Sequence, residues 1–242
     1  MLLAIDIGNT QIKLAVFEQN TIINKKTIPY SDWKMEVENT LINFSEIQNI
    51  VVASVGNLQK SDFLKFETYA EVFFFSNESK FPFQNQYVTP STQGIDRMVV
   101  AAGAVLKFPS QNRLIIDAGT CITYDFIDAN DVYHGGAISP GIRLRYESLH
   151  NYTSNLPLLK IENPNAIIGN STVQSIHSGV INGITLEIDG FISSISNKND
   201  NFIIILTGGD SEFLAERLKN TIFANPNFLL ESLNQTFQFN QQ

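Results

Sequence analysis

The fold is decided by residues 2–17, "LLAIDIGNTQIKLAVF", and by a second stretch of the same kind at 114–127, "LIIDAGTCITYDFI". In each stretch an apolar run ends in Asp-x-Gly, passes through Thr and resumes as a second apolar run. Strand-like runs joined by a short polar turn predict a β-hairpin. Because the chain contains this unit twice, the sequence favours two related domains.

The elements that follow each hairpin come in the same order, βββαβαβ. In the first half we expect strands at 2–7, 11–17, 20–28, 49–55 and 70–76, a helix from Ser31 as N-cap to about Phe44, and an amphipathic helical stretch before the last strand. In the second half we expect strands at 113–118, 121–128, 131–137 and 202–210, and helices from Ser139 and Pro140, over about 171–197 and over 211–220. The point at which the element order starts again lies close to residue 108, so we expect two domains, at 1–108 and 109–242. Residues 81–94 read as a long loop, and the polar tail 234–242 is expected to fray.

Composition places the chain among globular proteins with a sizeable core, since 43% of its 242 residues are hydrophobic and 17% are charged. A net charge of −8 argues against a non-specific nucleic-acid binder, which needs a basic surface. The single cysteine, Cys121, excludes an intramolecular disulfide and fits a reducing compartment. No apolar run approaches the length of a membrane span or has the form of a signal peptide. We therefore expect a cytoplasmic protein that does not bind a membrane.

The first turn can form a cradle for an anion. Gly8, Asn9 and Thr10 can direct backbone N–H groups and a hydroxyl toward one point, as phosphate-binding turns do. Asp6 would repel a bare phosphate, so this interpretation requires Mg²⁺ or a bridging water, and Lys13 can supply compensating charge. Taken alone, the turn is equally typical of an ordinary hairpin.

The second turn, with Asp117, Gly119 and Thr120, strengthens the phosphate interpretation. Two related domains can direct two such turns at one triphosphate, and the sequence has neither Gly-x-x-x-x-Gly-Lys-[Ser/Thr] nor Gly-x-Gly-x-x-Gly. The arrangement resembles the acetate and sugar kinase/heat-shock/actin superfamily. That resemblance implies an α/β fold of two tandem actin-like, ribonuclease H-like domains around a central nucleotide cleft.

Residues 94–97, "GIDR", open a predicted helix after the long loop. Asp96 could simply cap this helix, or it could accept a proton from a substrate hydroxyl while Arg97 holds a negative group of the same substrate. The three histidines lack the spacing of paired metal ligands, so no zinc site is expected.

Six segments together resemble one family, the type III pantothenate kinases. They are "DIGNTQIK", "YVTPSTQGIDR", "DAGTCITYD", "GGAISPG", "GNSTVQSIHSG" and "LTGGD", in the family's order and approximate spacing over nearly the whole chain. The resemblance implies phosphorylation of pantothenate by ATP, the first step of coenzyme A biosynthesis, in a homodimer that requires Mg²⁺ and K⁺ or NH₄⁺.

The same resemblance implies roles for individual residues. ATP binding falls to Asp6, Ile7, Gly8, Asn9, Thr10, Gln11, Ile12, Lys13 and Thr120. Pantothenate binding falls to Tyr87, Gly94, Ile95, Asp96, Arg97 and Thr172, with Asp96 as the proton acceptor. Asp117 would hold the monovalent cation, since a carboxylate oxygen suits a hard cation.

Two other functions remain open at this point: a kinase of another small hydroxy acid, and a non-catalytic relative that serves as an accessory factor for transcription. The intact acidic residues and the negative net charge argue against the second function in the form of direct DNA binding. The helix over 171–197 has an apolar stripe that fits either a homodimer interface or the core of one subunit equally well. The stripe consists of Val173, Ile176, Val180, Ile184 and Ile188.

Overall fold

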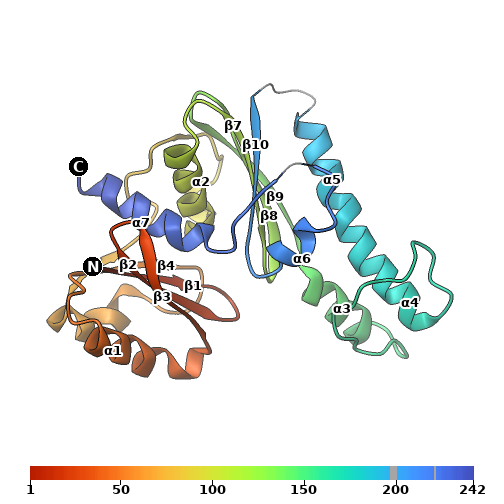
Figure 1. Cartoon of the computed structure of the whole chain (residues 1–242), viewed down its shortest axis with the longest axis horizontal. Helices are drawn as coiled ribbons and strands as arrows, with labels where there is room; N and C mark the ends of the chain where they lie inside the picture. The colour runs from red at the N-terminus through yellow and green to blue at the C-terminus, as the bar shows by residue number, and fades with distance from the viewer. Residues whose placement is uncertain (197–200, 221) are drawn as a thin grey trace. The chain divides into compact units, whose positions relative to one another are not determined.

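The computed structural model describes residues 1–196, 201–220 and 222–242 (Figure 1). By their internal contacts these residues form two units. The first unit comprises Met1–Ser110, Ala129–His134 and Asn227–Gln242, and the second comprises Gln111–Asp128 and Gly135–Pro226. The first unit therefore contains both ends of the chain, whereas the domains predicted from the sequence, 1–108 and 109–242, are continuous segments and stay a prediction.

The first unit is built on a five-stranded sheet in the order β3-β2-β1-β4-β5. Its strands are β1 (Leu2–Ile7), β2 (Ile12–Glu18), β3 (Thr21–Ile28), β4 (Asn49–Ser54) and β5 (Glu71–Phe74). β1 is antiparallel to β2 and parallel to β4. The predicted hairpin is confirmed, and so is the predicted order of these five strands along the chain. Because β1 and β4 run side by side in the same direction, both reach the same edge of the sheet at their carboxyl ends.

Helices cover both faces of this sheet (Figure 1). One face carries α1 (Trp33–Asn43) and the 3-10 helix η2 (Lys60–Thr68), which bury Trp33, Phe63 and Phe66 in one core. The other face carries α2 (Ile95–Lys107) and α7 (Phe228–Asn240). The predicted N-cap Ser31 is wrong by one residue: a 3-10 turn, η1 (Tyr30–Asp32), precedes α1, and Asp32 takes the cap position.

The loop at 81–94 contains two short elements, β6 (Gln84–Asn85) and η3 (Pro90–Thr92). β6 pairs with Val132 and Tyr133 at the start of β9 (Val132–Pro140), and these two residues belong to the first unit. This pairing attaches the first part of the loop to β9, and the rest of the loop leads from there to the start of α2.

In the second unit the strand order is β11-β10-β7-β8-β9. The new strands are β7 (Asn112–Ala118), β8 (Cys121–Ile127), β10 (Phe202–Thr207) and β11 (Phe223–Ala224). β7 is antiparallel to β8 and parallel to β10, with Asp117 directly opposite Thr207. The predicted second hairpin is confirmed, and its turn lies at the carboxyl end of β7.

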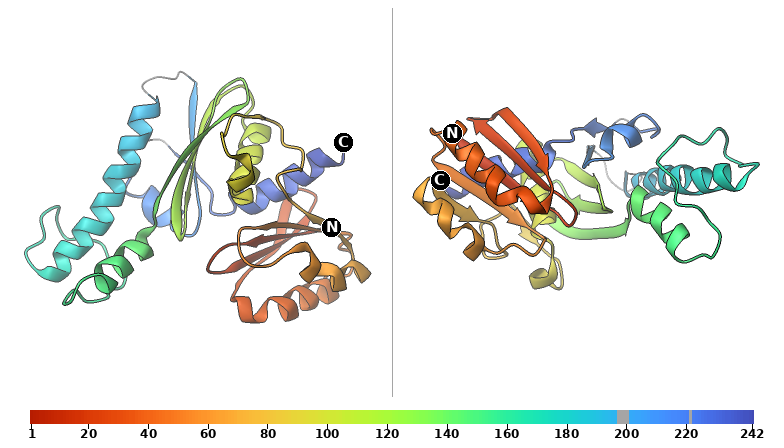
Figure 2. Two further views of the ribbon diagram at one scale, coloured as in Figure 1. Left: turned by 180° about the vertical axis from the view of Figure 1, so that it is seen from behind. Right: turned by 90° about the horizontal axis from the view of Figure 1, so that it is seen from below.

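The helices of the second unit are α3 (Ile142–Asn151), α4 (Thr172–His177), α5 (Gly183–Ser196) and the short α6 (Ser211–Ala215). A π-helical turn, η4 (Ser178–Asn182), joins α4 to α5, so the predicted long helix is confirmed through residue 196. Figure 2 shows α3 beside the α4 end of this helix. The helix predicted from Ser139 and Pro140 begins later, at Ile142, because β9 continues to Pro140. The one predicted over 211–220 ends at Ala215.

The apolar stripe of the long helix lies mainly in the core of its own unit. Ile176, Val180, Ile184 and Ile188 are each at most 6% exposed and pack against β7, β8 and β10, whereas Val173 is 40% exposed. Of the two interpretations that the sequence left open, burial within one subunit therefore accounts for four of the five residues.

The expectation of a frayed tail is wrong, since residues 234–240 complete α7. Asn234, Thr236 and Phe237 are buried, and the Asn234 side-chain amide donates to the carbonyl of Gln19 at 2.8 Å. A polar sequence is accommodated there because its side chains bond to β2–β3 turn residues. Within the described ranges, no helix has the length and apolar character needed to cross a membrane.

Candidate active site

The first turn places a buried carboxylate next to a lysine. Asp6 is 5% exposed and lies directly opposite Lys13 across the hairpin, with the Lys13 Nζ 3.7 Å from Oδ2 of Asp6. The Gly8 amide donates to the Gln11 carbonyl at 3.2 Å and closes the turn. The side chain of Lys13 is 31% exposed, so the ammonium group can reach both the carboxylate and a ligand.

Tyr30 supports this turn, a role that the sequence analysis missed. Its hydroxyl donates to the carbonyl of Gly8, and a β-carbon on Gly56 would overlap that hydroxyl. Burial raises the pKa of Tyr30, and the nearby charge of Asp6 raises it further. The hydroxyl therefore remains a donor through neutral and alkaline pH, and it holds the turn against the end of β4.

The predicted proton acceptor lies in the same region of the first unit. The Val55 amide, just after β4, donates to the Ile7 carbonyl at 3.0 Å. A β-carbon on Gly94 would lie 3.7 Å from Cγ1 of Val55 and 2.5 Å from Oδ1 of Asp96. Val55 thus connects the end of β1 to the start of α2, and the Asp96 carboxylate lies at that junction.

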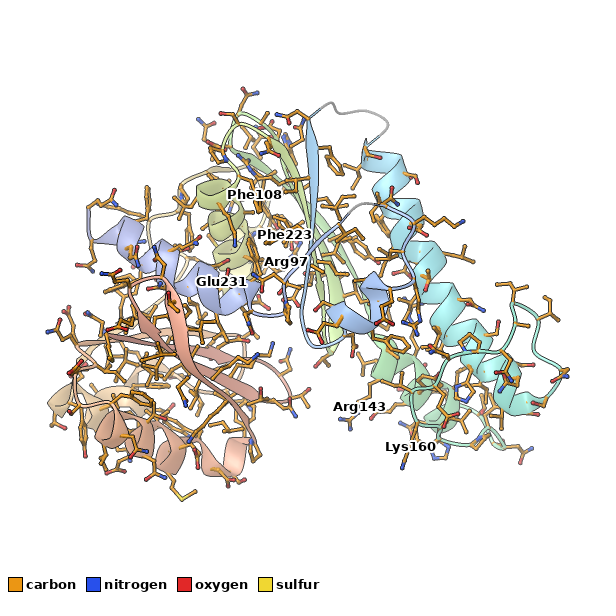
Figure 3. The ribbon with its side chains drawn as sticks, in the orientation of Figure 1. Arg97, Phe108, Arg143, Lys160, Phe223 and Glu231 are labelled. Atoms are coloured by element: carbon orange, nitrogen blue, oxygen red, sulfur yellow. The ribbon has the colours of Figure 1, made fainter. Side chains whose placement is uncertain are left out.

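Arg97 and Tyr87 form a second part of this region; Arg97 is labelled in Figure 3. Arg97 is only 6% exposed, and its guanidinium carbon lies 5.7 Å from the centre of the Tyr87 ring. Asn85 joins the two ends of the loop: its Oδ1 accepts from the Tyr87 amide at 2.9 Å, and its Nδ2 donates to Oε1 of Gln93 at 2.9 Å. The structure therefore brings together, at one end of α2, five of the residues predicted to bind pantothenate: Tyr87, Gly94, Ile95, Asp96 and Arg97. Asn85 and Gln93 were not found from the sequence because only the folded loop makes their contact.

In the second unit, the second turn is held between two glycine segments. The Gly119 amide donates to the Cys121 carbonyl at 2.9 Å, and the Gly141 amide donates to the Thr120 carbonyl at 3.0 Å. A β-carbon on Gly208 would lie 2.5 Å from Oδ1 of Asp117. The segments "GGAISPG" and "LTGGD" therefore pack directly against Thr120 and Asp117, the residues predicted to bind the nucleotide and the cation.

Thr172 lies in the second unit, at the first turn of α4. It lines an apolar pocket of about 430 Å³ together with Leu149, Leu156, Ser175, Ile176 and Gly179. Ser171 caps this helix, since its hydroxyl accepts from the Gln174 amide at 3.3 Å. Thr172 is therefore a polar group at the edge of an otherwise mainly apolar hollow.

The fold and its two Asp-Gly-Thr turns define an actin-like kinase of the acetate and sugar kinase/heat-shock/actin class. A family profile described as type III pantothenate kinase matches residues 2–194. The chain is 62% identical to a type III pantothenate kinase of Flavobacterium psychrophilum and 60% identical to one of Flavobacterium johnsoniae, covering 99% of this chain in both cases and 99% and 98% of those proteins. The chain belongs to the type III pantothenate kinase family.

Solved structures show the same fold at lower identity. A Campylobacter jejuni protein, described as a proposed Baf family transcriptional activator, is 24% identical with a TM-score of 0.63, over 99% of this chain and 98% of that one. A ROK family protein from Streptococcus pneumoniae is 15% identical with a TM-score of 0.54, over 100% and 99% of the two chains. Both support the actin-like α/β architecture.

Proposed function

We propose that this protein transfers the γ-phosphoryl group of ATP to the terminal hydroxyl of pantothenate, the first step toward coenzyme A. The observation that carries the proposal is the position of Asp96, whose carboxylate lies at the junction that Val55 makes between the first turn and α2. Relatives named type III pantothenate kinase at 62% and 60% identity support the choice of pantothenate. A purely regulatory role has weaker support, because the Campylobacter protein at 24% identity supports the fold alone.

In this proposal both turns bind phosphate groups of ATP. The first contributes residues 6–13, and the second contributes Thr120. Phosphoryl transfer depends mainly on positioning and on stabilising the charge of the phosphoryl oxygens. The backbone amides of the turns and the ammonium of Lys13 provide that stabilisation, and Tyr30 keeps the first turn in one conformation.

Asp6 fits a site for Mg²⁺ that also uses the phosphates of ATP. Mg²⁺ in kinases commonly binds one or two carboxylates together with substrate phosphates and waters. Asp6 supplies one such carboxylate, and among the described residues no three His, Cys, Asp or Glu side chains form a metal cage. Bound Mg²⁺ would neutralise charge on the β- and γ-phosphates.

Asp96 accepts the proton of the pantothenate hydroxyl as that oxygen attacks phosphorus. Arg97 binds the carboxylate of pantothenate through charge-assisted hydrogen bonds. The ring of Tyr87, 5.7 Å from the Arg97 guanidinium, restricts where that guanidinium can point. The three side chains together select a substrate that carries both a hydroxyl and an anionic group.

Asp117 holds a monovalent cation, K⁺ or NH₄⁺, in this proposal, and Thr207 fits a role as a second oxygen ligand. Residues paired in register on parallel strands point to the same face of a sheet, so the side chains of Asp117 and Thr207 are neighbours. Thr207 is 1% exposed, and its hydroxyl has no hydrogen-bond partner within the described part of the chain. A buried hydroxyl without a partner is costly, and a bound cation would satisfy its oxygen.

The protein acts as a homodimer in this proposal, and the surface around Thr172 supports it. Ile167 and Ile168 are 63% and 79% exposed, and Val173 is 40% exposed. The Ser178 hydroxyl donates to the Ile167 carbonyl at 2.5 Å and so links the loop that carries the two isoleucines to η4. An exposed apolar patch is typical of a protein interface. A second copy would cover it and bring acceptor residues to Thr172.

The test is release of ADP by the purified protein with ATP and Mg²⁺, with and without pantothenate. We expect release to depend on pantothenate. Acetate and a set of sugars serve as competing acceptors. Equal or faster release with one of these acceptors would replace pantothenate with that substrate, and no acceptor-dependent release would contradict the kinase assignment for this chain.

A further inference from the structure

An ion pair in the second unit joins α3 to α5 and bonds to the last residues of β9. Arg145 on α3 and Glu187 on α5 approach to 2.6 Å between Nη2 and Oε2, and their side chains are 21% and 26% exposed. The Tyr124 hydroxyl donates to Oε1 of Glu187 at 2.9 Å. Burial raises the pKa of Glu187, but hydrogen bonds from Arg145, Ser139 and Tyr124 outweigh it and hold the pKa below its usual value. Glu187 is therefore a fixed anion at neutral pH.

Arg145 also bonds to the end of β9, where the chain turns toward α3. Its Nε donates to the Pro140 carbonyl at 2.9 Å, and its Nη2 donates to the Ser139 hydroxyl at 2.8 Å. One planar guanidinium thus joins Glu187 to both Ser139 and Pro140. Lysine cannot reproduce this geometry because its ammonium is a single point of charge on a flexible stem.

The segment that Arg145 holds is in direct contact with the second turn. Gly141 follows Pro140, and its amide donates to the Thr120 carbonyl at 3.0 Å. A β-carbon on Gly141 would overlap the carbonyl oxygen of Gly119, so the two backbones touch without spare room. A shift of residues 139–141 toward the turn would therefore push on Gly119, and a shift away from it would stretch the bond to Thr120.

We propose that Arg145 and Glu187 are positioning residues for the second phosphate turn, acting on Thr120 through Ser139, Pro140 and Gly141. They do not touch ATP themselves. The inference rests on the proposed function only in taking Thr120 as a nucleotide contact. Loss of the guanidinium frees residues 139–141, so the turn samples positions in which Thr120 no longer meets the phosphates.

The chain offers a matched control on the same helix. Arg143 pairs with Glu147 at 2.7 Å, but its side chain is 72% exposed and projects outward from α3 (Figure 3). An Arg-to-Lys change at position 143 alters the same kind of ion pair on the same helix, but the hydrogen bond that it affects goes to Glu147 and not to residues 139 and 140.

The experiment measures ADP binding by calorimetry, without pantothenate, for wild type, Arg145→Lys, Glu187→Gln, the double variant and Arg143→Lys. We expect the dissociation constant to rise about tenfold in Arg145→Lys, a smaller effect than the roughly 10²-fold that a misplacement of about 1 Å can cost in a reaction. In the double variant, we expect less than the product of the single effects, because the two residues act as one unit. Arg143→Lys should bind ADP as wild type does.

Steady-state kinetics and thermal unfolding distinguish positioning from a loss of stability. KM for ATP should rise in Arg145→Lys while KM for pantothenate stays within about twofold, a split that general destabilisation does not produce. Unchanged ADP binding in both Arg145→Lys and Glu187→Gln would overturn the inference and leave the proposed function intact. If wild type binds ADP but shows no pantothenate-dependent turnover, the proposed function fails while the binding data still decide the role of Arg145.

Discussion

Tyr30 donates a hydrogen bond from its hydroxyl to the carbonyl oxygen of Gly8, in the middle of the first turn. The bond joins a residue just beyond the third strand to the loop that binds phosphate in the proposed reaction. Because burial keeps the pKa of Tyr30 high, the hydroxyl retains its proton over the whole pH range in which a kinase is assayed. The turn is therefore fixed by a side chain that need not contact ATP.

Replacing Tyr30 with Phe should weaken ATP binding about fivefold, the expected effect of losing one hydrogen bond of about 1 kcal/mol. The measurement is ATP or ADP affinity at pH 7 and at pH 9, and we expect the same ratio of variant to wild type at both. The control is Tyr69→Phe, since Tyr69 is 47% exposed and bonds only weakly to Glu38 at 3.4 Å. Equal affinities for wild type and Tyr30→Phe would show that the turn holds its shape without this bond.

Asp96→Asn should fold and bind ATP as wild type does, but lose roughly 10²- to 10⁴-fold in turnover. An amide preserves the shape of the side chain and cannot accept the hydroxyl proton. Turnover is measured as pantothenate-dependent ADP release. A variant that keeps more than about half of wild-type turnover would remove Asp96 from the role of base.

Activity should rise when Na⁺ is replaced by K⁺ or NH₄⁺, and both Asp117→Asn and Thr207→Val should reduce that rise. Thr207→Val keeps the volume of the side chain and removes a hydroxyl that has no partner within the described residues, so its folding stability should be unchanged or higher. The measurement is turnover against cation concentration at constant ionic strength. Rates that do not depend on the cation in wild type would count against the site.

The proposed dimer is tested at the exposed patch. Ile184 also lies on the apolar stripe, but it is 0% exposed in its own unit, so a charge there would disrupt the core. Ile168→Glu should shift sedimentation from dimer to monomer and raise KM for pantothenate. Ile42→Glu is the control, since Ile42 is 61% exposed on α1 of the first unit. A wild-type protein that sediments as a fully active monomer would end the shared-site proposal and leave the kinase assignment untouched.

One substitution at two helical glycines should have opposite effects on stability. A β-carbon on Gly103 in α2 would overlap the Ser232 side chain of α7, so Gly103→Ala should destabilise the fold by about 1–3 kcal/mol. Apart from its own helical turn, no atom of the described residues lies within 4 Å of that position at Gly190 in α5, so Gly190→Ala should stabilise by up to about 1 kcal/mol. Urea unfolding of both variants measures the difference, and the same sign for both would contradict the packing of α2 on α7.

The repeated Asp-x-Gly turns were sufficient to predict the two hairpins, and the apolar runs were sufficient to predict the order of the strands along the chain, because both are local signals. Contacts between distant segments were not predictable in this way. Tyr30 meets Gly8, and Arg145 meets Glu187, only after folding, and no local pattern marks either contact. The stripe on the long helix shows the same limit, because periodicity identifies an apolar face but does not say what covers it.

The tail illustrates the reverse error, since its polar sequence concealed a buried helix. α7 covers the face of the first sheet formed by β1 and β4, and Leu229, Leu230 and Leu233 are at most 6% exposed there. During synthesis the five strands of this sheet leave the ribosome long before α7 exists. The first unit therefore cannot finish folding until α7 has been translated, and the part of the sheet that α7 covers must be kept from aggregating until then. A nascent chain interrupted before residue 228 would lack α7 altogether, and only α2 would be left to cover that face of the sheet.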